Sequence, residues 1–240
     1  MRNIWRVTNM RFAAVLMCAL SAAIQCVQAG ERCGALSGFG QFGPFDYRTD
    51  KNPLAQVEGS HFNVYVENLV RGQSGTIAGD LDYTLRAFPN HHRALVAIMR
   101  YSERLRTPQP YGAGYTVDCY FERGTRFRPA DSTVRLLYGN YLAKIGRPQE
   151  ALVQMQAAEK LIVENANLHY NMGLVYMTLK DYDKALRHAH RAYELGWQLP
   201  GLRNMLQRAG KWQEPSKEES ATVEAPATTA EPESKPSAPN

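Results

Sequence analysis

The chain has 240 residues, enough for one ordinary domain with attached segments. Hydrophobic residues make up 44% of it, so part of the chain can bury a core, and the formal net charge is a moderate +5. The basic residues are scattered along the sequence, which argues against a dedicated nucleic-acid-binding protein.

The first 29 residues have the pattern of a secretory signal peptide. Three arginines within the first eleven residues are followed by an apolar run over residues 12–24. That run is shorter than the ~20 residues that span a bilayer, which favours a cleaved signal over the alternative, a retained membrane anchor. Val27 and Ala29 occupy the two positions that a signal peptidase recognises. We therefore predict cleavage after Ala29 and a periplasmic or secreted protein.

Residues 30–79 are predicted to form an irregular N-terminal arm. The stretch 30–59 is rich in glycine and aromatic residues and has no helical period, so we expect it to lie extended on the body. Within it, the segment 45–48 (Phe-Asp-Tyr-Arg) is expected to anchor the arm by packing and a salt bridge. One short helix is predicted over residues 63–71, with Asn63 as its N-cap.

Two cysteines, Cys33 and Cys119, are left once the signal is removed. Neither belongs to a Cys-x-x-Cys motif, which argues against a redox-catalytic role. Two leftover cysteines in an oxidising compartment usually pair. We therefore predict a Cys33–Cys119 disulfide that ties the arm to the body.

The segments that follow the arm are predicted to be mainly helical. Residues 80–88 fit a helix or a strand, and a helix is favoured because their ending, with Pro89, is echoed 40 residues later at Pro129. Helices are predicted over residues 91–105 and 117–125. Between them, residues 107–116 contain two prolines and two glycines and form an insertion.

An internal repeat with a period of 34 residues relates residues 132–165 to residues 166–199. Small residues recur where two helices would cross closely, and leucines recur where they would pack. The matching pairs are Gly139 and Gly173, Ala151 and Ala185, Leu152 and Leu186, Ala158 and Ala192, and Leu161 and Leu195. This pattern resembles the tetratricopeptide-repeat (TPR) family, in an exported bacterial type.

The resemblance implies an all-α fold, a TPR-like solenoid of about three helical hairpins over residues 80–212. Two clear repeats are too few to stand alone, so the earlier helices and a short capping helix over residues 202–209 are expected to complete the body. Residues 213–240 consist mainly of Pro, Ala, Ser, Thr and Glu, and we predict a disordered tail. The tail carries a net charge of −4, which leaves the body, residues 30–212, at +6.

The resemblance also implies a concave face lined by the first helix of each repeat, where family members bind peptides or protein tails. The ninth position of these helices is Asn140 and Leu174, and less clearly Arg100 and Arg208. Leu174 departs from the Lys, Asn and Arg set with which the family holds a terminal carboxylate, so no carboxylate clamp is predicted. The full set of predicted partner-binding residues is Arg100, Leu136, Asn140, Lys144, Tyr170, Asn171, Leu174, Met177 and Arg208.

No catalytic motif is present in the sequence. His188 and His190 are two residues apart on one predicted helix and point away from each other, whereas His61 and His169 are isolated. We therefore predict no enzyme activity, no metal site and no cofactor. The predicted function is an exported adaptor or scaffold that binds a protein or peptide partner in the cell envelope. The alternative is an accessory domain of an envelope polysaccharide or enzyme assembly, whose basic body contacts an anionic polymer.

Overall fold

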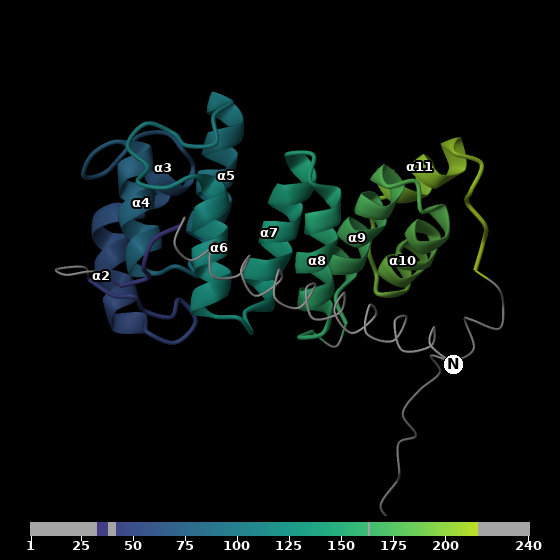
Figure 1. Ribbon diagram of the computed structural model, residues 1–240, viewed down its shortest axis with the longest axis horizontal. Coiled ribbons are helices and arrows are strands. Elements are labelled where there is room, and N and C mark those ends of the chain that lie inside the picture. The colour runs from purple at the N-terminus through teal and green to yellow at the C-terminus, as the bar shows by residue number, and fades with distance from the viewer. Residues whose placement is uncertain (1–32, 38–41, 163, 216–240) are drawn as a thin grey trace, which may run out of the picture.

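The protein is an array of helices that follow one another along its long axis (Figure 1). The computed structural model describes residues 33–37, 42–162 and 164–215, and all of the regular structure within these ranges is helical. In these ranges no helix is both long enough and apolar enough to cross a membrane. The predicted signal peptide, residues 1–29, lies outside them, as does most of the predicted tail. The helices are α2 (Lys51–His61), α3 (Val64–Glu67), α4 (Ile77–Ala87), α5 (His92–Leu105), α6 (Val117–Phe127), α7 (Ser132–Lys144), α8 (Pro148–Glu159), α9 (Ala166–Thr178), α10 (Tyr182–Glu194) and α11 (Gly201–Arg208).

The predicted all-α solenoid of about three hairpins is confirmed. Helices α5 and α6, α7 and α8, and α9 and α10 form successive antiparallel pairs, and α11 follows the last pair as the predicted cap. One continuous core runs from Phe62 to Leu206 through all of these pairs. Each hairpin packs its apolar side chains against those of its neighbours, so the hairpins share one core.

Small residues of the repeat lie where helices approach most closely. A Cβ on Gly139 would lie 2.6 Å from Cγ of Met155 and 3.1 Å from the carbonyl oxygen of Ala151, so α7 crosses α8 with no room for a larger residue. Ala151 and Ala185 are fully buried. Gly173 lies directly against Leu202 of α11, so the glycine of the second repeat allows the capping helix to pack closely on α9.

Residues 80–88, for which the sequence allowed a helix or a strand, lie almost entirely in helix α4. Helices α4 and α6 begin with the same kind of N-cap. Thr76 caps α4 by accepting a hydrogen bond from Gly79 N, and Thr116 caps α6 by accepting one from Cys119 N. The two caps are 40 residues apart, the same offset as the two closing prolines. The predicted insertion 107–116 is a loop, and Gly114 N in it donates to Asp82 Oδ1 of α4 over 3.1 Å.

The prediction of an irregular arm is wrong for residues 51–61, which form α2, whereas the short helix predicted over residues 63–71 is present as α3. Helix α2 buries only Leu54 and Val57, one turn apart, against the end of α4, so its apolar period is too short to recognise. Asn63 caps α3 as predicted. The helix ends earlier than expected, and Leu69 follows in the left-handed region with φ 58°.

The rest of the arm is fixed to α6 at its start. Cys33 and Cys119 form the predicted disulfide. Beside it, the fully buried Arg123 donates from Nη1 to the carbonyl oxygens of Cys33 at 3.0 Å and Ala35 at 2.6 Å. Arg126 Nη2 donates to the Gly34 carbonyl oxygen over 2.7 Å. Two arginines of α6 thus satisfy three successive carbonyls of the arm.

The predicted anchor at residues 45–48 is confirmed, and it contains a buried carboxylate. Asp46 is 4% exposed and accepts hydrogen bonds from Arg48, Arg128 and Asn90, at 2.9 Å, 2.7 Å and 2.8 Å respectively. The hydrogen bond from Arg48 holds the pKa of Asp46 far below its usual range, against the opposing effect of burial. The bond from Asn90 adds to this lowering. Asp46 is therefore ionised in the folded protein well below pH 4.

This carboxylate makes a testable contribution to acid stability. In the unfolded chain Asp46 would take up a proton near pH ~4, whereas in the fold it stays charged, so its stabilisation is present above that pH and is lost as the pH falls further. We expect Asp46→Asn to lower the free energy of unfolding at neutral pH. Between about pH 5 and pH 2 the free energy of unfolding of this variant should fall less than that of the wild type. Urea unfolding at several pH values measures this. Parallel curves for the two proteins would contradict it.

The first three residues of the predicted tail lie in the described part of the chain. These residues, 213–215, contact the body. His190 Nε2 donates to the Gln213 carbonyl oxygen over 2.8 Å, and Glu214 pairs with Arg203 at 2.7 Å. Trp212 Nε1 donates to the same carboxylate. The remaining tail, residues 216–240, lies outside the described part of the chain.

Candidate functional site

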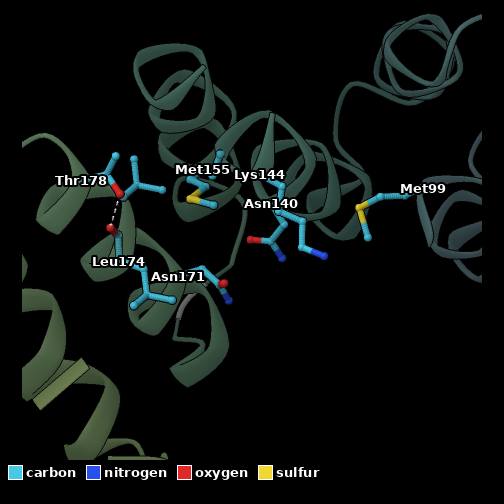
Figure 2. A pocket seen from close by; sticks show the side chains of 9 residues that line it. Met99, Asn140, Lys144, Met155, Asn171, Leu174 and Thr178 are labelled. Atoms are coloured by element: carbon cyan, nitrogen blue, oxygen red, sulfur yellow. Dashed lines mark hydrogen bonds between the residues drawn. The ribbon is translucent and has the colours of Figure 1, made fainter. Parts of the chain in front are cut away.

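The first helices of the three hairpins, α5, α7 and α9, line a groove with a cavity of about 420 Å³. Figure 2 shows Met99 on one side of it, Asn171 and Leu174 on the other, and Asn140 and Lys144 between them. The size lies in the range of about 300–1,000 Å³ that is usual for ligand sites. The lining residues are Met99, Asn140, Ala143, Lys144, Met155, Asn171, Leu174, Val175 and Thr178.

Helical spacing explains why these side chains share one face. Asn140 and Lys144 are four residues apart on α7, and Asn171, Leu174 and Thr178 are three and four residues apart on α9. Residues at these spacings stand one above the other on a helix. Each helix therefore presents a short column of side chains to the groove.

The base of the groove is apolar. Met155 is fully buried, Val175 is 2% exposed and Met99 is 7% exposed. Leu174 is half-buried against the same core. A ligand side chain placed here would leave water for an apolar surface, which is favourable by roughly 25 cal/mol per Å² of area covered.

Polar groups stand above this base, and one of them is unsatisfied. Oδ1 of Asn140 is buried and accepts no hydrogen bond from any residue that the structure describes. Buried polar atoms are normally paired, so such an oxygen is suited to a donor supplied by a ligand. Asn171 Nδ2 donates to the carbonyl oxygen of Asn167 over 2.7 Å. At the rim, Lys144 Nζ pairs with Glu103 of α5 at 2.7 Å.

Four of the nine predicted partner-binding residues come together in this groove: Asn140, Lys144, Asn171 and Leu174. They come from the two clear repeats, where the 34-residue period fixes the register of both first helices. The structure thus places the ninth-position pair, Asn140 and Leu174, in one cavity.

The other five predicted residues lie elsewhere. Leu136 is 7% exposed and belongs to the core. Tyr170 stacks on Trp197 with ring centroids 4.7 Å apart, so it packs against the loop that precedes α11. Met177 is partly buried against the core. Arg100 lines a separate cavity of about 250 Å³ beside α5 and α7, and Arg208 is exposed at the end of α11.

Five lining residues were not among the predicted ones: Met99, Ala143, Met155, Val175 and Thr178. Thr178 could have been found, because it follows Leu174 by one helical turn. Met99 is adjacent to the predicted Arg100, and one residue rotates the side chain by about 100° around the helix. Met155 belongs to a second helix, and it reaches the groove beside Gly139 because that glycine leaves room for it.

Comparison with family models matches residues 166–196 to the tetratricopeptide repeat. The match spans α9, the turn after it and all of α10. The chain is a TPR-containing protein. A stack of TPR hairpins is a scaffold for protein interaction, because its curvature creates an extended concave surface. The groove described above is lined mainly by the first helices of the three hairpins.

Comparison with solved structures matches 31 chains. A crystal structure of MamA is 17% identical, with a TM-score of 0.43, over 57% of this chain and 78% of that one. A second MamA structure is 18% identical, with a TM-score of 0.38, over 64% and 87%. A point mutant of MamA is 18% identical, with a TM-score of 0.38, over 50% of this chain and 66% of that one, slightly less than two thirds. Comparison with curated proteins gives no match.

Proposed function

We propose that this protein is an exported, non-enzymatic TPR adaptor whose groove binds an extended segment of a protein or peptide partner in the cell envelope. The observation that carries the proposal is the unsatisfied Oδ1 of Asn140 above an apolar base. An extended peptide offers both features that this site needs: a backbone N–H that donates to Asn140, and an apolar side chain that fills the cavity.

The composition of the groove favours a peptide over a highly charged ligand. Lys144 is the single cation among the lining residues, and its Nζ is already paired with Glu103. The lining carries two amides and a hydroxyl, which suit hydrogen bonding to a neutral backbone. We propose that Leu174, Val175 and Met99 contact one apolar side chain of the partner.

Export is supported by the disulfide. The Cys33–Cys119 bond is consistent with an oxidising compartment, because such bonds are rare in the reducing cytosol of most organisms. We propose that the signal peptide over residues 1–29 takes the chain there. Cell fractionation and mass spectrometry of the purified protein test this part separately, with Gly30 expected as the first residue. A cytosolic protein that retains Met1 would contradict it.

Cross-linking from within the groove tests the binding proposal. A photoreactive amino acid at Leu174 should join the protein to a discrete partner in the producing cells. The same amino acid at Leu199, which is exposed before α11 and does not line the groove, should not. Mass spectrometry of the adduct identifies the peptide. Equal products from the two positions would contradict the groove as the binding site.

The amides give the corresponding prediction for affinity. Asn140→Ala combined with Asn171→Ala should weaken binding of the identified peptide by about tenfold or more, because two hydrogen-bonding groups are lost from a largely buried contact. Titration calorimetry measures this, and circular dichroism should show unchanged helicity. Asn204→Ala, at an exposed position on α11, is the matched control and should bind like the wild type. Binding that survives the double substitution but disappears in high salt would instead favour contact with an anionic polymer.

A further inference from the structure

Three side chains with metal-ligating atoms meet where the first clear repeat packs on the second. Glu159 is the last residue of α8, His169 lies in the first turn of α9, and His188 lies in the middle of α10. One ligand atom from each lies within 4.8 Å of the other two. The sequence predicts that His169 is isolated, and this is wrong, because the α9–α10 hairpin places it opposite His188.

The distances within this cluster suit a small ion. Nδ1 of His169 lies 3.0 Å from Nδ1 of His188 and 3.9 Å from Oε1 of Glu159. Ligand atoms bonded at about 2.1 Å to a tetrahedral ion lie about 3.4 Å from one another. The two measured distances lie on either side of that value. Glu159 is 40% exposed, so its carboxylate can move by the fraction of an ångström that binding of the ion requires.

The surroundings orient the imidazoles as they are oriented in metal sites. Nε2 of His169 faces Oε2 of Glu164 at 3.7 Å, and Arg191 holds both oxygens of this carboxylate, Oε1 at 2.6 Å and Oε2 at 3.0 Å. A histidine that binds a metal through one nitrogen commonly has a carboxylate beside the other. The ring of Tyr176 stacks on His188 with an interplanar angle of 18°, which fixes the plane of that imidazole.

A metal binds neutral imidazole, so each histidine of the cluster would bind an ion through a ring nitrogen that carries no proton. Without an ion, the two Nδ1 atoms can share one hydrogen bond, which is the simpler explanation of their short distance.

We infer that Glu159, His169 and His188 form a binding site for a divalent transition-metal ion of the Zn²⁺ class. Two imidazoles and one carboxylate are ligands that Zn²⁺ accepts, and they leave one tetrahedral position for water or for a fourth ligand. The three ligands come from three helices, so the ion joins α8 to the α9–α10 hairpin. Its binding stabilises the contact between the two repeats, because the separated helices cannot bind it in this geometry.

Zinc titration of the untagged protein, first treated with a chelator, tests this site. We expect one equivalent of Zn²⁺ to bind with a rise in the thermal unfolding midpoint, and Co²⁺ in its place to give the visible absorption of a tetrahedral centre. His169→Ala and His188→Ala should abolish both effects. His190→Ala, two residues along α10, should retain them, because the ring of His190 bonds to the Gln213 carbonyl oxygen and does not belong to the cluster.

Glu159→Gln keeps the test decisive if a histidine variant fails to fold. Glu159 is half-exposed at the end of its helix, so the amide should leave the fold intact while it weakens Zn²⁺ binding by about tenfold or more. Absence of stoichiometric Zn²⁺ binding to the wild type would overturn the inference. Wild-type affinity in the folded Glu159→Gln, His169→Ala and His188→Ala variants would overturn it as well, since the ion would then bind elsewhere.

Discussion

Reduction of the Cys33–Cys119 disulfide should lower the free energy of unfolding by about 4 kcal/mol. The bond joins residues 86 apart in sequence, and a closure of that length removes much conformational entropy from the unfolded chain. For a body of this size the thermal midpoint should fall by roughly 10 °C. Scanning calorimetry with and without a reductant measures the difference.

The double variant Cys33→Ala and Cys119→Ala provides the control for this effect. It should unfold at the midpoint of the reduced wild type, and the reductant should not change it further. It should also lose protection of the arm from proteases, because the hydrogen bonds from Arg123 and Arg126 would then hold residues 33–35 without a covalent bond. A reductant that leaves the wild-type midpoint unchanged would show that the arm is held by these arginines and not by the disulfide.

The repeat body could be predicted because its close contacts require particular residues at a fixed period. Gly139 lies where α7 crosses α8, and no larger side chain fits there. The glycine recurs 34 residues later as Gly173, which lies against Leu202, and this period reveals both hairpins and fixes the faces of their first helices. This is why Asn140 and Leu174, which hold the same position in the two first helices, line one cavity.

The remaining features depend on contacts that have no period. Helix α2 buries two apolar side chains, too few to distinguish it from a loop. On α5, outside the clear repeats, an error of one residue selected Arg100 in place of Met99, because each residue turns the helix by about 100°. The approach of His169 to His188 depends on the rotation of two helices at once. A pattern along one helix therefore cannot reveal it.

Asp131→Ala should destabilise the protein by about 3–5 kcal/mol, because it removes one member of a buried charged network. Asp131 is 2% exposed and caps α7 by accepting a hydrogen bond from Val134 N over 3.2 Å. Its carboxylate also accepts bonds from Asn90 and His92, both at 3.0 Å, and pairs with Arg48 at 3.4 Å. Alanine would leave the buried Asn90 amide and the His92 imidazole without this acceptor. Urea unfolding followed by circular dichroism measures the loss.

Asp181→Ala separates this network from capping alone. Asp181 caps α10 through Lys184 N in the same way, but its side chain is 34% exposed, so water can replace the lost contacts. Its loss of stability should be clearly smaller. Asp131→Asn, which keeps an acceptor for the cap but removes the charge, should fall between Asp131→Ala and the wild type. Equal losses in Asp131→Ala and Asp181→Ala would mean that capping accounts for the whole effect, and that the contacts between the arm, α5 and α7 through Asp131 add nothing measurable.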